Sequence, residues 1–173
     1  FPPVAQPPDY HDFADRRTWL GVPNAADVLS NLGFLIAGIA GLRVCLRRRL
    51  VARAQYLVCF TGITLTAAGS AYYHWDPDSA RLVWDRLPMT LGFMGLLAAI
   101  VGERLGPRLG RHLLAPLLVI GPGSVLYWAA SEAWGAGDLR PYAAVQFLSL
   151  LIIAALLVLA PRVYGHPRLL RAG

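Results

Sequence analysis

The chain has 173 residues, of which 56% are hydrophobic and only 15% are charged. This composition is too apolar for an ordinary soluble domain, and the length suits a single polytopic membrane bundle. The formal net charge of +6 would also be compatible with a nucleic-acid-binding protein, but the arginine positions indicate a membrane topology instead.

The chain begins with a polar, proline-rich segment, residues 1–26, in which Tyr10, Phe13 and Trp19 are interleaved. Amphipathic aromatic rings favour the boundary between membrane and water. We therefore expect this segment at the membrane surface, followed by one bundle over residues 27–161. Residues 162–173 would form a basic cytoplasmic tail or the start of a further segment.

Five segments approach the roughly 20 mostly apolar residues that a membrane-spanning helix needs. They predict an all-α transmembrane bundle with helices at 28–46, 54–74, 87–102, 113–134 and 142–160. We expect Asp27 to cap the first helix and Pro88 to lie in the first turn of the third. In the fourth helix, the run Gly121-Pro122-Gly123 predicts a kink or a break.

The arginines lie unequally on the two sides of the predicted bundle, and short loops rich in arginine stay in the cytoplasm. This bias predicts an outer N-terminus and an inner C-terminus. It also explains the positive charge without a nucleic-acid partner. Eleven arginines fall on the inner side: Arg43, Arg47, Arg48, Arg49, Arg53, Arg104, Arg108, Arg111, Arg162, Arg168 and Arg171.

Three polar side chains, Ser70, His74 and Asp85, lie where the second predicted helix ends and the third begins. Ser70 and His74 are four residues apart and share one helix face. The short connection 75–84 brings Asp85 back beside them, and ionisable groups at such depth mark functional sites. The alternatives are that Asp85 caps the third helix, that His74 is an interfacial residue, and that Ser70 bonds to a carbonyl one turn earlier.

The motif around these side chains resembles the central motif of the alkaline ceramidase family. It reads Gly69-Ser70-Ala71-Tyr72-Tyr73-His74, with Asp85-Arg86-Leu87-Pro88-Met89 beginning eleven positions after the histidine. The segment from Asn24 to Asn31 is similar to the motif that opens the first helix in that family. The resemblance extends from Tyr10 to about Pro161. The family belongs to a group of seven-helix membrane hydrolases that includes the adiponectin and progestin receptors.

The resemblance implies a zinc-dependent intramembrane amidase that hydrolyses ceramide, or a related N-acyl lipid, to a fatty acid and a sphingoid-type amine. It assigns His74 as a zinc ligand, Asp85 as the acid beside the metal-bound water and Ser70 as a hydrogen-bond donor to the oxyanion. We expect a bacterial inner-membrane protein with its site near the periplasmic face.

A catalytic zinc takes three protein ligands, and the family supplies two of them from a His-x-x-x-His pair on the seventh helix. This sequence has no such pair. His112 and His166 are expected on the inner side, across about 30 Å of hydrocarbon, and His11 lies in an irregular segment. We therefore expect the last two helices of the family to lie outside this sequence.

The resemblance also implies a calcium site before the first helix. Asp12 and Asp15 match an acid pair of the family, while Asn24 and Arg17 stand where oxygen ligands are expected. Calcium takes six to eight oxygen ligands, which Asp12, Asp15, Asn24 and Asp27 would supply in part. The alternative is a solvated acidic surface in which Asp27 is only a helix cap.

Two further functions stay open. The first is a non-catalytic, lipid-binding or receptor-like member of the same fold. The second is a small transporter, for which the interrupted fourth helix is the argument. Other features have structural explanations: Tyr127, Trp128, Trp134 and Tyr142 predict an outer aromatic belt, and Glu132 and Asp138 are expected to be loop charges.

Overall fold

The computed structural model describes residues 2–13 and 15–161, so the predicted tail at 162–173 lies outside the described residues. The described chain is helical, as predicted, with one isolated bridge between Trp19 and Val22. The elements are η1 (Pro8–His11), α1 (Ala25–Ser30), α2 (Leu32–Arg47), α3 (Arg53–Trp75), α4 (Ser79–Arg104), α5 (Pro107–Ala133) and α6 (Arg140–Leu159).

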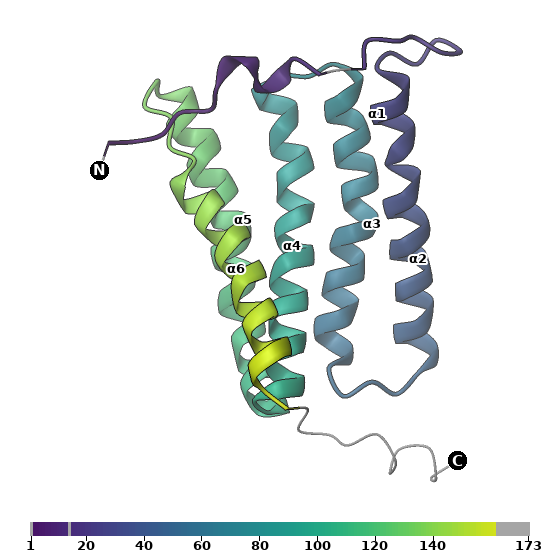
Figure 1. Ribbon diagram of the computed structural model, residues 1–173, viewed down its shortest axis with the longest axis vertical. Helices are drawn as coiled ribbons and strands as arrows, with labels where there is room; N and C mark the ends of the chain where they lie inside the picture. The colour runs from purple at the N-terminus through teal and green to yellow at the C-terminus, as the bar shows by residue number, and fades with distance from the viewer. Residues whose placement is uncertain (1, 14, 162–173) are drawn as a thin grey trace.

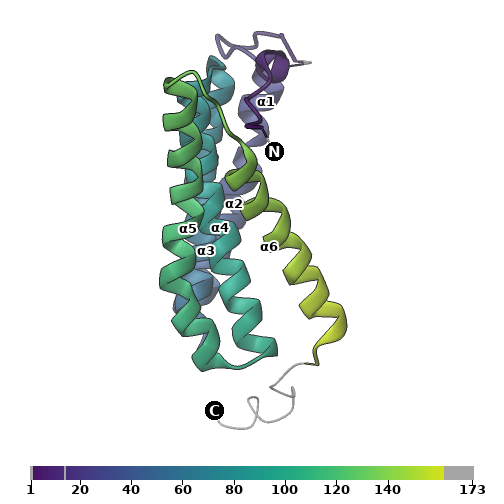
Figure 2. The same cartoon turned by 90° about the vertical axis from the view of Figure 1, so that its left-hand side faces the viewer.

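The long helices form a bundle in which α3 packs between α2 and α4, and α4 packs between α3 and α5 (Figure 1). Helix α6 contacts α4 and α5 and diverges from them toward the end of the bundle that holds the α2–α3 and α4–α5 connections (Figure 2). The N-terminal segment crosses the opposite end, above α3 to α6 (Figure 1). We call this opposite end the site end, because it holds Ser70, His74 and Asp85.

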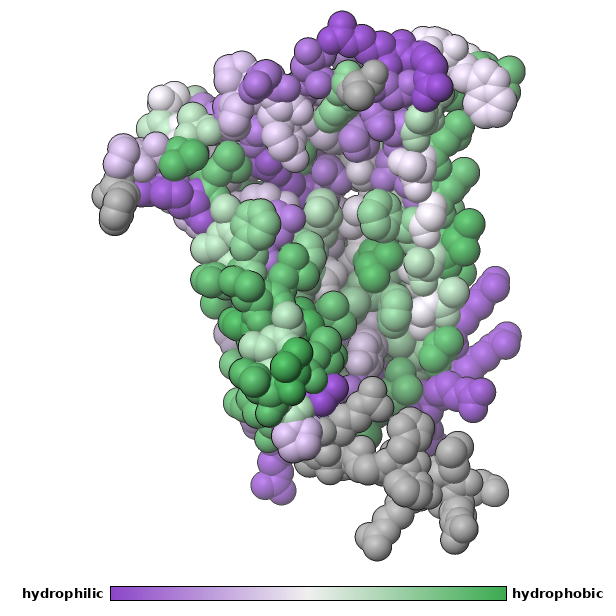
Figure 3. All heavy atoms as spheres, in the orientation of Figure 1, coloured by the Kyte–Doolittle hydropathy of each residue, from purple (hydrophilic) through white to green (hydrophobic). Residues whose placement is uncertain are grey.

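The surface of the bundle is largely apolar along the helices and hydrophilic at the two ends (Figure 3). Within the described residues, four helical stretches are long and apolar enough to cross a membrane: 25–47, 79–104, 107–133 and 140–159. Helix α3 is not among them, although its 23 residues run alongside these helices. Some of its polar residues lie inside the bundle, where Thr66 and Ser70 are buried. These features indicate an integral membrane protein.

The first predicted helix is divided into α1 and α2, and the prediction that Asp27 caps it is wrong. The N-cap residue is Asn24, which has a left-handed backbone conformation with a φ of 46°. Asp27 lies within the first turn of α1, where its backbone carbonyl accepts a 2.9 Å hydrogen bond from the side-chain amide of Asn31. The N-terminus of α1 is capped from a distance, because the Asp15 carboxylate accepts a 2.7 Å hydrogen bond from the Ala26 backbone amide.

The third predicted helix begins earlier than expected, at Ser79, so the α3–α4 connection is only residues 76–78. The N-cap of α4 is Asp78, whose side chain accepts a hydrogen bond from the Arg81 amide at 2.7 Å. The alternative in which Asp85 caps this helix is therefore wrong. Pro88 lies well inside the helix and not in its first turn, so its missing amide matters.

Glycine at position 69 allows α3 to approach α4 very closely. A Cβ atom at Gly69 would overlap the backbone carbonyl oxygen of Trp84. This carbonyl lies four residues before Pro88, which has no amide hydrogen to donate to it. The exposed carbonyl of α4 and the bare backbone of α3 therefore meet at one point. Ser70 and Asp85 are the next residues on the two helices, so the same contact brings them together.

Helix α5 is continuous from Pro107 to Ala133, so of the predicted kink or break at Gly121-Pro122-Gly123 the break is wrong, and the kink stays a prediction. Gly121 is instead a packing residue: a Cβ there would lie 2.7 Å from the Met94 side chain and 3.2 Å from that of Thr90. The glycine thus lets α5 approach α4, as small residues do in membrane bundles.

Replacing Gly69 with Ala is expected to lower the free energy of unfolding by about 1–3 kcal/mol, because the new methyl group forces α3 away from α4. The control is Gly123→Ala, where a Cβ would meet no atom within 4 Å. This change should be neutral, or stabilising by up to about 1 kcal/mol through helix propensity. Unfolding in mixed micelles, followed by circular dichroism, measures both. Equal stability of Gly69→Ala and the parent protein would contradict the close contact.

Candidate functional site

Ser70 and Asp85 line the same pocket, of about 320 Å³, enclosed by α2, α3 and α4. Ser70 is buried and Asp85 is half-buried, and the Ser70 hydroxyl lies near the Asp85 carboxylate. The rest of the pocket is mostly apolar: Phe34, Cys59, Ile63, Thr66, Met89, Gly92, Phe93 and Leu96. The Thr66 hydroxyl donates to the Gly62 carbonyl of its own helix at 2.9 Å. The pocket therefore combines a polar end with walls suited to a hydrocarbon chain.

His74 lies one turn beyond Ser70, under the N-terminal segment. Its ring is close to that of Phe13, with 4.7 Å between the centroids, and its backbone carbonyl accepts a 2.8 Å hydrogen bond from the Asn24 side-chain amide. Its Nδ1 atom is buried without a hydrogen-bond partner. Ser70 and His74 both lie close enough to Asp85 to influence its carboxylate, so the three predicted side chains do lie in one region. A buried imidazole nitrogen without a partner is a suitable metal ligand.

The described residues do not by themselves fit a catalytic zinc. No group of three His, Cys, Asp or Glu side chains in this part of the chain is arranged to hold a metal ion. His11 is near, but its Nδ1 atom is 2.9 Å from the Tyr73 hydroxyl and its Nε2 atom is 3.1 Å from the Ser79 hydroxyl. His112 is exposed near the start of α5, at the opposite end of the bundle, and His166 lies outside the described residues. His74 is thus a single ligand where three are required.

The four predicted calcium ligands are partly occupied by other contacts. Asp12 forms an ion pair with Arg16. The two carboxylate oxygens of Asp15 accept hydrogen bonds from the Arg17 guanidinium, at 2.5 Å, and from the Ala26 amide. The Asn24 amide nitrogen bonds to His74, and Asp27 lies on α1. Calcium would have to displace two arginines, so binding there stays a prediction.

A buried guanidinium, that of Arg86, is the main feature of this end that the sequence did not reveal. The side chain is 4% exposed and donates a 2.7 Å hydrogen bond to the Gln6 side chain. Its charge lies over the rings of Trp128, Tyr142 and Tyr10, at 4.2, 4.7 and 5.4 Å from the ring centroids. Such cation–π contacts stabilise a desolvated cation. Arg86 thus joins α4, α5, α6 and the N-terminal segment.

The predicted outer aromatic belt is only partly correct, because Trp128 and Tyr142 are buried around Arg86, whereas Tyr127 and Trp134 are exposed. A periodic signal was present in the sequence: Leu82, Arg86, Thr90 and Met94 follow one another at four-residue intervals and are all buried. The late start predicted for this helix concealed that periodicity.

The expected loop charges Glu132 and Asp138 instead hold the N-terminal segment and the α5–α6 connection. The Glu132 carboxylate accepts hydrogen bonds from the backbone amide of Gln6 at 2.8 Å and from the Trp128 indole at 3.1 Å. Asp138 is buried, and the adjacent Arg140 guanidinium holds the pKa of that carboxyl well below its usual range. The Leu139 amide donates to the Val4 carbonyl at 2.8 Å. The N-terminal segment is therefore fixed across the site end.

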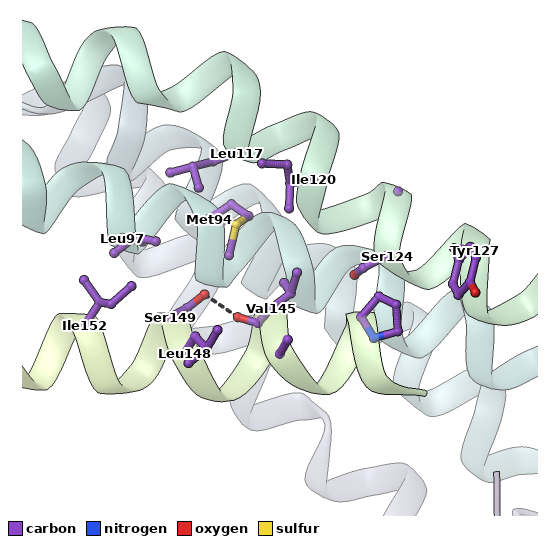
Figure 4. Close-up of a pocket in the computed structure, with 13 residues that line it drawn as sticks. Met94, Leu97, Leu117, Ile120, Ser124, Tyr127, Val145, Leu148, Ser149 and Ile152 are labelled. Atoms are coloured by element: carbon purple, nitrogen blue, oxygen red, sulfur yellow. Dashed lines mark hydrogen bonds between the residues drawn. The ribbon is translucent and has the colours of Figure 1, made fainter. Parts of the chain in front are cut away.

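A second pocket, of about 580 Å³, lies between α4, α5 and α6 (Figure 4). The pocket that Asp85 lines is instead bounded by α2, α3 and α4. Its two serine hydroxyls bond within their own helices. Ser124 donates to the Gly121 carbonyl, and Ser149 donates to the Val145 carbonyl (Figure 4). No Asp, Glu, His or Arg side chain lines it. This pocket offers hydrocarbon contact but no acid–base chemistry, so the candidate reaction site is the pocket of Ser70 and Asp85.

Comparison of the chain with protein-family models, with curated proteins and with solved structures finds no match. The resemblance to alkaline ceramidases therefore rests on the motif residues alone.

The Asp15 contacts predict a loss of order of the N-terminal segment in acid. The Arg17 guanidinium, followed by the Ala26 amide, lowers the pKa of the Asp15 carboxyl from its ordinary value. A carboxyl with a lowered folded pKa stabilises the fold above its unfolded pKa, about 3.9, and this contribution disappears as the pH falls through the folded value. Hydrogen exchange of the Ala26 amide, corrected for intrinsic rates, should accelerate below about pH 4.

The matched variant is Asp15→Asn, which removes the titrating group. Its Ala26 amide should exchange faster at neutral pH and show little further change in acid. This account of the cap would be contradicted if the corrected exchange rate of the Ala26 amide in the parent protein were the same at neutral pH as in acid.

Proposed function

We propose that this chain forms the lipid-binding and acid–base part of a membrane amidase that hydrolyses ceramide or a related N-acyl lipid. The observation that carries the proposal is the pocket in which Ser70 and Asp85 form the polar end of an otherwise apolar cavity. A site with this division suits a substrate that has an amide group joined to a hydrocarbon chain.

The acyl chain would lie along the apolar wall formed by Phe34, Ile63, Phe93 and Leu96. The amide carbonyl would then lie beside Ser70, because this residue and Asp85 are the hydroxyl and the carboxylate of that pocket that can take part in hydrolysis. The N-terminal segment covers the site end, so a lipid would enter sideways between helices.

The chemistry derived for these side chains is amide hydrolysis by water. Asp85 accepts a proton from the attacking water as the new C–O bond forms, and Ser70 donates a hydrogen bond to the developing oxyanion. The C–N bond then breaks, and Asp85 delivers its proton to the leaving amine. The products are a fatty acid and a sphingoid-type amine.

The resemblance adds a zinc ion at His74, and we retain it as part of the proposal. The chemistry that a bound zinc ion would supply is polarisation of the carbonyl and a lowered pKa of bound water, towards about 7. The free Nδ1 atom of His74 supports this assignment. The other ligands would have to come from outside the described residues, because both ring nitrogens of His11 already lie within hydrogen-bond distance of a hydroxyl group. Bound calcium is proposed on the same resemblance.

The orientation proposed from the arginine bias puts the candidate site at the outer face of a bacterial inner membrane. Nine of the ten acidic residues lie on that side in the proposed topology, and Glu103 is the exception. Proteolysis of the N-terminal segment in intact spheroplasts reports this orientation.

Replacing the proposed catalytic residues in the purified full-length protein should abolish or strongly reduce the release of fatty acid from a short-chain fluorescent ceramide. Asp85→Asn removes the proton acceptor, and His74→Ala removes the zinc ligand, so both should be inactive. Ser70→Ala removes one oxyanion donor and should reduce kcat about 10²–10³-fold. Bound zinc, measured by mass spectrometry, should fall in His74→Ala and remain in Asp85→Asn.

The matched controls are Asp76→Asn and His112→Ala. Asp76 is an exposed carboxylate in the α3–α4 connection, and His112 is an exposed histidine at the opposite end of the bundle. Both should keep the parent activity and zinc content. Normal turnover in Asp85→Asn or His74→Ala would refute the assigned roles. A parent protein that binds ceramide without hydrolysing it would instead support the non-catalytic, lipid-binding alternative.

A further inference from the structure

The arginines at the two ends of the bundle have different surroundings. At the site end, the arginines on the surface are paired with carboxylates: Arg16 with Asp12, Arg17 with Asp15, Arg81 with Asp76, and Arg140 with Asp138. Arg86 is buried among aromatic rings. The positive charge at this end is therefore balanced or enclosed within the protein.

The opposite end carries seven exposed arginines, which we call the arginine surface. They lie at the end of α2, in the α2–α3 connection and at the starts of α3 and α5: Arg43, Arg47, Arg48, Arg49, Arg53, Arg108 and Arg111. Hydrophilic side chains project below the apolar belt at this end (Figure 3). Over residues 2–13 and 15–161, none of the ion pairs includes any of these seven.

Among the described residues, this end holds too few side-chain carboxylates to neutralise seven arginines. Glu103 is the acidic residue there, and it accepts a 2.7 Å hydrogen bond from the Tyr56 hydroxyl between α3 and α4. Arg104 is separate from the surface, because it donates to the Ala160 carbonyl at 2.6 Å. Residues 162–173 contain no Asp or Glu. Most of the counter-charge for the arginine surface is therefore not supplied by the side chains of residues 1–173.

The position of the arginines indicates what supplies that charge. They lie where the apolar belt ends, so a bilayer that covers the membrane-length helices would bring its phosphate groups beside them. A guanidinium group matches a phosphate geometrically through paired N–H donors. Basic clusters beside membrane helices bind anionic lipids more strongly as their number of charges rises.

We propose that the arginine surface binds the phosphate headgroups of anionic phospholipids in the adjacent leaflet, with the α2–α3 connection as its centre. Arg47, Arg48, Arg49 and Arg53 form this centre, within seven consecutive residues. The proposal is independent of the hydrolase function, since it concerns the other end of the bundle.

The test is native mass spectrometry of the full-length protein, released from micelles with equal amounts of phosphatidylglycerol and phosphatidylcholine. The parent protein should retain phosphatidylglycerol in preference to phosphatidylcholine. Replacing the four central arginines with Gln should reduce that preference about tenfold or more. Raising the salt from about 0.15 M to about 1 M should also weaken it, because screening shortens from about 8 Å to about 3 Å.

Two controls separate charge from folding and from general basicity. Replacing the same four residues with Lys keeps the charge and should keep most of the lipid preference. Replacing Arg16 and Arg17 with Gln removes two paired arginines at the site end and should leave the preference unchanged. The proposal is overturned if the fourfold Gln variant prefers phosphatidylglycerol as strongly as the parent protein does, or if the Arg16 and Arg17 variant loses the preference equally. Displacement of the lipid by a short RNA at about 0.15 M salt would also overturn it, in favour of a nucleic-acid partner.

Discussion

The contact of the Gly69 backbone with the Trp84 carbonyl determines how the candidate site is assembled. Pro88 leaves that carbonyl without its helical amide donor, and the absence of a side chain at Gly69 lets the backbone of α3 reach it. Ser70 and Asp85, the following residues on the two helices, then line one pocket. The Gly-Ser pair and the Asp-Arg-Leu-Pro run of the motif therefore have a joint structural role in addition to any chemical one.

The same pattern continues along the α3–α4 contact. A Cβ at Gly62 would be 2.7 Å from the Pro88 carbonyl, and one at Gly95 would be 2.6 Å from the Cys59 amide. Small residues bring the two backbones together where lipid provides no hydrophobic force between helices. The result is a rigid pair of helices, and rigid helices can position a hydroxyl and a carboxylate more accurately than loops do.

Beside this pair, the site end is organised by a desolvated charge. Arg86 is held by three aromatic rings and one amide oxygen, with no ion pair among the described residues. Two of its contacts, Gln6 and Tyr10, come from the N-terminal segment, and that segment also covers His74 through Phe13. Asp85 and Arg86 thus face different sides of α4: one lines the candidate site, and the other fixes the segment that covers it.

The sequence by itself determined the helical membrane class, because apolar segments of bilayer length have few alternative structures. It also determined the second helix almost to the residue, and the spacing of Ser70, His74 and Asp85 correctly predicted that they lie in one region. The start of α4 was wrong by eight residues, because the polar first turns and Pro88 resemble a loop followed by a helix start. Tertiary structure alone decided the contact of Gly69 with Trp84, the burial of Arg86 and the position of His11 beside the hydroxyl groups of Tyr73 and Ser79. Each of these depends on residues far apart in the chain that become neighbours only when the helices pack.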